Sequence, residues 1–239
     1  MLNREMTIRS VVADDYRAAA VFERHGIDFC CGGNRPIAEA CRERGTDDRQ
    51  VVAELEAALA SAQDQPRFAA WDLDFLATYI VNNHHAYVRQ AVGPMQAHTR
   101  KVAEVHGDHH PEVREIAQRF DLVVADLTAH MAKEERMLFP YISRLSAAAR
   151  GGELPVAPFG TIANPIGMME IEHKNAGDHL AAIRTLSAGF VPPSDACTTF
   201  KVTYQELQAF EADLHRHVHL ENNILFPRAI DLERELREK

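Results

Sequence analysis

Few cysteines and no long apolar run are found in this sequence. Four cysteines in 239 residues are too few for a disulfide scaffold, so we expect reduced thiols. No uncharged apolar segment of about 18 residues occurs, which argues against a membrane span. Charged residues interrupt the first thirty positions, where a signal peptide would need an apolar stretch. We therefore expect a cytoplasmic protein without a membrane partner.

Basic clusters are missing as well. The formal net charge is −9 at pH 7, and lysine and arginine form no run. Proteins that bind nucleic acid or an anionic surface through charge present a basic patch. The sequence therefore predicts no nucleic-acid partner.

No segment alternates apolar and polar residues with the period of two that indicates a half-buried strand. Segments rich in Ala, Leu, Glu and Arg favour helix instead, and Gly, Pro and polar clusters separate them. Short helices are expected over 7–12, 14–25, 36–44 and 48–60, and longer ones over 72–105, 111–147, 165–188 and 195–235. The sequence predicts an all-α protein whose long helices form an antiparallel four-helix bundle.

A polar stretch separates the short helices from the long ones. Residues 61–70 include Gln-Asp-Gln-Pro, which suits a linker. We therefore divide the chain into a small N-terminal helical domain, residues 1–62, and the bundle, residues 71–239.

Three prolines fall within the long helical segments. Pro94 lies inside the first, whereas Pro140 and Pro227 each follow a Leu-Phe pair in the second and fourth. Proline lacks a backbone N–H, and its ring clashes with the preceding helical turn. We therefore expect each of them to kink or end its helix.

One motif occurs twice in the bundle. His130-x3-Glu134-x3-Leu-Phe-Pro returns as His217-x3-Glu221-x3-Leu-Phe-Pro. Side chains four residues apart lie on one face of a helix, so each His-Glu pair can reach a single ion. The Leu-Phe that follows in each copy places this face toward the bundle interior, where unpaired carboxylates are costly without a cation.

Each copy of the motif follows an upstream histidine at nearly the same interval. There are 45 residues from His85 to His130 and 44 from His173 to His217. Two helical hairpins related by an approximate two-fold axis would each bring the upstream histidine opposite its own motif. The alternative is a solvent-exposed helix face whose repeat only reflects gene duplication. Such a repeat would not need to keep both ligand types or the matched interval.

Together these side chains supply four imidazoles and two carboxylates to one core, the ligand set of a carboxylate-bridged two-metal site. The predicted ligands are His85, His130, Glu134, His173, His217 and Glu221. The absence of thiolate disfavours structural zinc, and an all-oxygen set would have suited calcium or magnesium. Iron or manganese fits best, with positions left for an oxo or hydroxo bridge and an exogenous ligand.

His84 is the alternative to His85. Neighbouring residues on a helix point about 100° apart, so the two histidines cannot face the same ion. The matched interval selects His85.

Several segments together resemble the RIC (repair of iron centres) family of di-iron proteins over almost the whole chain. They are Phe29-Cys-Cys-Gly-Gly33, Val105-His-Gly107, His130-Met-Ala-Lys-Glu-Glu135, Glu172-His173 and the segment from His217 to Pro227. The resemblance implies a short N-terminal domain joined to a hemerythrin-like four-helix bundle. It also implies two iron ions at the six residues above, with the two glutamates bridging.

The same resemblance implies repair of iron–sulfur clusters in damaged or apo client proteins under nitrosative or oxidative stress, by supplying iron. Such an iron donor is not a turnover enzyme. The alternative is binding or reduction of nitric oxide at the di-iron centre. Oxygen is another expected small ligand. The oxygen carriers of the wider hemerythrin group, however, bind their iron through five histidines, whereas the repeated motif here supplies four. Simple oxygen carriage is therefore not the expected role.

Cys30 and Cys31 precede Gly32 and Gly33 in the N-terminal domain. A flexible turn there would leave the thiolates accessible, for redox chemistry, for relaying a metal or for accepting a nitrosyl group. The alternative is that they are small buried apolar residues. A small domain with exposed thiols could also mediate a homodimer.

Overall fold

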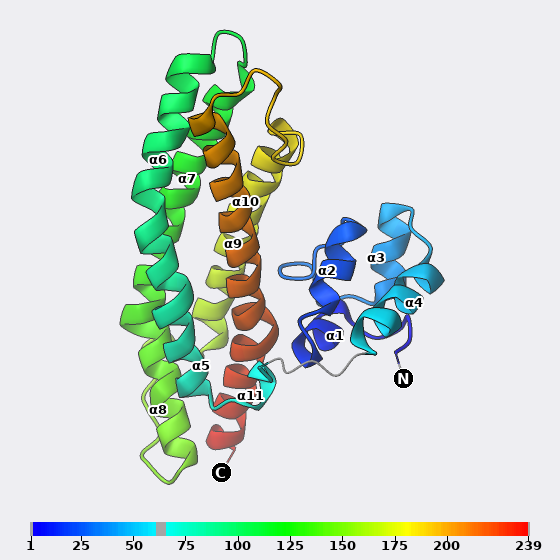
Figure 1. The fold of residues 1–239 in the computed structure, drawn as a ribbon. Coiled ribbons are helices and arrows are strands. Elements are labelled where there is room, and N and C mark those ends of the chain that lie inside the picture. Colours follow the sequence, from blue (N-terminus) through cyan, green and yellow to red (C-terminus); the bar gives the residue numbers. More distant parts are fainter. Residues whose placement is uncertain (1, 61–65, 239) are drawn as a thin grey trace.

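The computed structural model describes residues 2–60 and 66–238 (Figure 1). In these two ranges every regular element is helical, apart from one β-bridge between Thr7 and Pro36. The all-α prediction is confirmed. The domain boundary expected between 62 and 71 borders residues 61–65, which lie outside the described part, and it stays a prediction; the rest of the expected linker contains a 3-10 turn, Phe68–Ala70.

Short helices make up the N-terminal part: α1 (Ile8–Asp14), α2 (Ala18–Arg24), α3 (Ile37–Arg44) and α4 (Asp48–Leu59). Side chains cap two of them, because Thr7 accepts from the backbone N–H of Ser10 and Asp47 accepts from that of Arg49. Helices this short are not stable alone and depend on packing. Ile8, Phe22 and Leu55 are fully buried and belong to the same apolar cluster as residues of the bundle.

Four long helical columns stand side by side in the bundle (Figure 1). They are α5 (Leu73–Ile80) with α6 (Ala86–His106), α7 (Glu112–Lys133) with α8 (Phe139–Ala149), α9 (Ala163–Leu186), and α10 (Thr198–His219) with α11 (Phe226–Arg237). The N-terminal helices lie against one side of this bundle, near α10 and α11. The predicted four-helix bundle is confirmed.

A π-helical turn interrupts three of the four columns, and each turn carries a predicted site residue. The turns are Val81–His85, Glu134–Leu138 and Leu220–Leu225. A π turn holds one extra residue in the helix and so changes the direction of the side chains that follow it. The sequence analysis did not predict these turns.

Two of the π turns also explain why proline is tolerated. Pro140 and Pro227 sit in the first turn of α8 and α11, directly after a π turn, so the column continues past both. Because proline has no N–H, the carbonyl four residues before it loses its α-helical hydrogen-bond partner. In both cases that carbonyl belongs to the π turn, where the i→i+4 bonding is already broken. Pro94 lies inside α6 without ending it. An end of the helix at Pro94 is therefore wrong, whereas a kink there stays a prediction. At Pro140 and Pro227 the α-helix is interrupted just before the proline.

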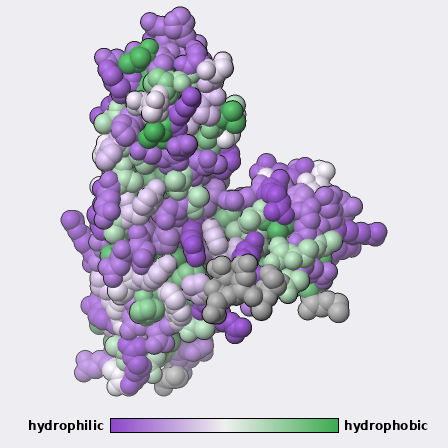
Figure 2. Space-filling model, viewed as in Figure 1, coloured by the Kyte–Doolittle hydropathy of each residue, from purple (hydrophilic) through white to green (hydrophobic). Residues whose placement is uncertain are grey.

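In the described part of the chain, no helix is both long enough and apolar enough to cross a membrane. Hydrophilic residues cover most of the face of the bundle shown in Figure 2, with apolar residues scattered singly among them.

Candidate metal centre

The six predicted ligands converge in the bundle interior, at the level of the π turns. They form two groups, His85, Glu134, His217 and Glu221, and His130, Glu134, His173 and Glu221, in each of which the potential ligand atoms lie within 4.8 Å of one another. None of the six residues is more than 1% exposed. Both glutamates belong to both groups, as bridging carboxylates would.

Each close pair of imidazoles joins one histidine from each of the two helical hairpins. His85 Nε2 lies 3.2 Å from His217 Nε2, and His130 Nε2 lies 2.9 Å from His173 Nε2. Each upstream histidine does lie opposite its own motif, since Nε2 of His85 is 3.4 Å from Glu134 and Nε2 of His173 is 3.1 Å from Glu221. Each group nevertheless takes one histidine from each hairpin, so neither hairpin can complete an ion position alone.

Hydrogen bonds on the outer side fix three of the four rings. Nδ1 of His85 donates to Glu135 at 2.7 Å and Nδ1 of His130 donates to Glu172 at 2.9 Å. A ring that carries its proton on Nδ1 presents a lone pair at Nε2 when it is neutral. In both rings Nε2 therefore faces the interior as a ligand atom.

Asn222 fixes the third ring, that of His173. Its Oδ1 accepts from Nδ1 of His173 at 2.8 Å, while its Nδ2 donates to the backbone carbonyl of Cys30 at 3.1 Å. The second bond settles which end of the amide faces the ring. For the fourth ring, Nδ1 of His217 is buried and has no hydrogen-bond partner in the described part of the chain.

The carboxylates show that these residues suit a cation. Both oxygens of Glu134 and Oε2 of Glu221 are buried without a hydrogen bond, although the imidazole Nε2 atoms approach Glu134 to 3.3 Å. Facing lone pairs and unsatisfied buried carboxylates repel one another unless positive charge lies between them. Nitrogen and oxygen donors in this number fit two transition-metal ions.

The ionisation of the cluster depends on its internal charges. Burial disfavours the charged form of Glu221, but His217 and His173 outweigh it and hold the pKa of this carboxyl well below its ordinary value. Burial also disfavours protonation of His130, yet Glu134 outweighs it and raises the pKa of the imidazole to about 9. Without metal, the internal charges thus favour the ionised form of both glutamates and the protonated form of His130.

His84 lies outside both groups. Its Nδ1 is 2.9 Å from Asp213, and its ring stacks on that of His217, with centroids 5.6 Å apart and planes 9° apart. The structure thus brings His85, and not His84, to the other predicted ligands.

Cys30 and Cys31 lie in the loop that the N-terminal part places against the bundle. Asp28 accepts from the backbone N–H groups of Cys30, Cys31 and Gly32 at 2.9–3.0 Å, which fixes the loop. Cys30 is only 8% exposed, and the Cys31 thiol together with burial raises its pKa well above the ordinary value. The expectation of two accessible thiolates is therefore wrong for Cys30, because the loop is docked; Cys31 is half-buried, and all four cysteines are free.

Two neighbouring asparagines of the last π turn hold this loop. Asn222 binds the carbonyl of Cys30, and Asn223 donates to that of Phe29 at 2.9 Å. Arg9 in turn donates to Asn223 at 3.2 Å. Of the two asparagines, Asn222 links the loop by hydrogen bonds to His173, one of the predicted ligands.

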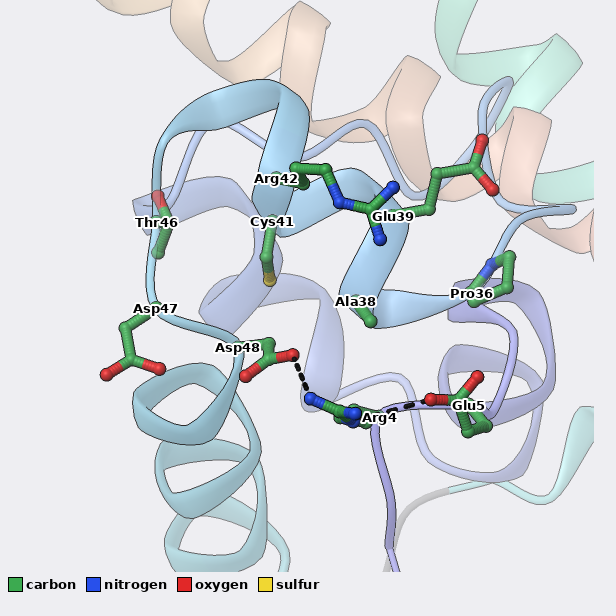
Figure 3. Close-up of a pocket in the computed structure, with 10 residues that line it drawn as sticks. All are labelled: Arg4, Glu5, Pro36, Ala38, Glu39, Cys41, Arg42, Thr46, Asp47 and Asp48. Atoms are coloured by element: carbon green, nitrogen blue, oxygen red, sulfur yellow. Dashed lines mark hydrogen bonds and ion pairs between the residues drawn. The ribbon is translucent and has the colours of Figure 1, made fainter.

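Sequence reasoning missed the residues that hold the ligands from outside: Glu135, Glu172 and Asn222. All three lie next to a predicted ligand in the sequence and within the segments that resemble the RIC family, and these two signals could have identified them. A hollow of about 580 Å³ also opens in the N-terminal part between α3 and the start of α4 (Figure 3). Arg4 pairs there with Glu5 and Asp48, and none of the predicted site residues lines it.

Comparison with known proteins agrees with this arrangement. Residues 76–229 match the hemerythrin HHE cation-binding domain, and residues 4–59 match a domain of unknown function (DUF542). The chain is 36% identical over 231 residues to the iron-sulfur cluster repair protein YtfE of Musicola paradisiaca, covering 95% of this chain and 97% of that protein. It is 34% identical over 218 residues to the proteins of the same name from Yersinia pseudotuberculosis and Yersinia pestis, covering 90% of this chain and 91% of theirs.

Proposed function

The chain belongs to the YtfE family of iron–sulfur cluster repair proteins, and we propose that it restores clusters damaged by nitrosative or oxidative stress by donating iron from its bundle. Its clients would be damaged or apo iron–sulfur proteins of the cytoplasm. Iron is then the cargo as well as the occupant of the site.

The observation that carries the proposal is the enclosed set of four imidazoles and two shared carboxylates. Two ions, each held by two of the histidines and both held by Glu134 and Glu221, would place positive charge beside every carboxylate oxygen of the centre that lacks a hydrogen bond. Bound there, iron would supply redox chemistry and a position for a small ligand such as oxygen or nitric oxide. Ferrous iron binds carboxylates less tightly than ferric iron, so reduction would favour release and the glutamates would act as its gate.

Cys30 and Cys31 are proposed to relay the metal or to undergo redox exchange. In support, Asn222 connects the Cys30 carbonyl to His173, and Asp28 with both thiols forms a third group of potential metal ligands. Since Cys30 is buried, this role requires the loop to open. Dimerisation through the N-terminal part stays a prediction, which light scattering can test.

The proposal is tested by mixing the iron-loaded protein with a dehydratase whose iron–sulfur cluster has been depleted, and following the recovery of dehydratase activity. We expect recovery above that produced by the same concentration of free iron. Glu221→Gln is the matched control, because it keeps the shape of the side chain and removes a bridging charge. With this variant, the recovery of dehydratase activity should fall to the level produced by free iron. Recovery no better than free iron from the wild type would contradict iron donation.

Reduction of nitric oxide is the second candidate, because both groups share Glu134 and Glu221 and two ions would therefore be adjacent. Gas analysis separates it from donation. Each nitrous oxide formed from two nitric oxide molecules consumes two electrons and two protons, so the assay contains excess reductant. Several equivalents of nitrous oxide per protein, without loss of iron, would favour the reductase, and reversible binding of nitric oxide without product would favour a binding module.

A further inference from the structure

We propose that the two ion positions are unequal, and that the ion between His85 and His217 is the one donated. This inference rests on the proposed iron-donor function. It goes beyond that function by naming which half of the centre releases its metal and which half retains it.

The two positions differ in what holds their histidines from outside. At the position shared by His130 and His173, both Nδ1 atoms have acceptors, namely Glu172 and Asn222. At the other position, His85 donates to Glu135, but Nδ1 of His217 is buried and finds no partner among residues 2–60 and 66–238.

The sequence repeat explains the difference. Glu172 directly precedes His173 and accepts from His130, and the residue in the corresponding place, directly before His85, is His84. A carboxylate there would face His217 as Glu172 faces His130. His84 instead stacks on the ring of His217 and turns its Nδ1 to Asp213. The approximate two-fold symmetry of the centre is broken here, and also at the residue that follows each motif glutamate, where Glu135 accepts from His85 but Asn222 accepts from His173.

An acceptor on the outer nitrogen fixes the ring and makes its inner nitrogen more basic, and losing such a partner costs about 10- to 100-fold in metal affinity. His217 lacks this support, so its position binds the ion less tightly. After that ion leaves, Glu134 and Glu221 can still bind the ion held by His130 and His173. The buried carboxylates would therefore remain compensated after release of one ion.

Loss of iron to a chelator tests the inference. Metal analysis comes first, because fewer than two irons per chain would overturn the proposed function itself. The two-iron protein is then reduced with dithionite and mixed with excess bipyridyl. We expect two phases of one iron each, with rates that differ at least about tenfold. A single phase releasing both irons would overturn the inference while leaving iron donation intact.

Two matched variants assign the phases. Glu135 and Glu172 are both about one-quarter exposed, and each also pairs with one cation, Arg89 and Lys133 respectively. Glu135→Gln should accelerate only the fast phase, and Glu172→Gln only the slow one, with unchanged helical content by circular dichroism. The reverse assignment would overturn the proposal, and a purely structural role would move both phases together.

Discussion

His85 and His217 face each other through their Nε2 atoms at 3.2 Å, although 132 residues separate them in the sequence. His130 and His173 form the corresponding pair at 2.9 Å. Because each pair joins one histidine from each hairpin, the centre forms only when the hairpins are packed together. Metal binding and folding of the bundle are therefore coupled, and iron should stabilise the folded protein.

Replacing the two asparagines separates docking of the cysteine loop from metal binding. Asn222→Ala removes the acceptor of His173 and the donor to Cys30, so iron affinity should fall about 10- to 100-fold. Asn223→Ala is the control, since it releases the Phe29 carbonyl without touching a ligand. Amide hydrogen exchange over residues 29–33 should quicken in both variants, whereas competition with a chelator should show weaker iron binding only in the first. An equal loss of iron affinity in both variants would contradict the conclusion that Asn222 affects iron binding through its hydrogen bond to His173.

Gly33 should be intolerant of any side chain. A Cβ built there would lie 2.7 Å from the Phe29 carbonyl oxygen, which Asn223 already holds. Gly33→Ala should therefore lower the free energy of unfolding by about 1–3 kcal/mol, as measured by urea titration.

Gly177, inside α9, is the matched control for Gly33. Apart from its chain neighbours and its own helical backbone, no described atom lies within 4 Å of a Cβ added there. Gly177→Ala should raise the free energy of unfolding by roughly 0.5–1 kcal/mol, because alanine is the better helix former. A Gly33→Ala variant as stable as the wild type would show that the loop is not packed as described.

His219 should make the metal-free protein sensitive to acid. Burial, helped by the charge of Arg216, lowers its pKa from 6.5 to about 3, and Asn223 donates to its Nδ1. The unfolded chain takes up this proton as the pH falls below 6.5, whereas the folded chain does not until the pH nears 3. Stability is therefore lost on acidification, by about 1.4 kcal/mol per pH unit from this group.

His219→Gln removes that titration. Between pH 7 and pH 5, urea titrations of the metal-free wild type should show a loss about 2 kcal/mol greater than those of the variant. Identical losses would mean that His219 titrates in the folded protein much as it does in the unfolded chain.

The bundle and the convergence of the six residues could be predicted from the sequence, because helical periodicity and the spacing of the repeat report which side chains share a face. The π turns could not, since one extra residue only shifts the phase of that periodicity at a single point, and the few apolar positions on either side do not locate such a shift. Nor could the crossing of His85 to His217, because a repeat does not specify which hairpin faces which. The burial of Cys30 depends on Asn222, which lies 192 residues further along the chain. Contacts at such separation are set by packing and not by local pattern.

The most direct test of the two-ion centre is metal analysis combined with Mössbauer spectroscopy on the wild type and on Glu134→Gln and Glu221→Gln. Both glutamates are fully buried and shared by the two groups of ligands. We expect two antiferromagnetically coupled irons per chain in the wild type and loss of the coupled pair in either variant. One zinc per chain, or a coupled pair that survives both substitutions, would contradict it.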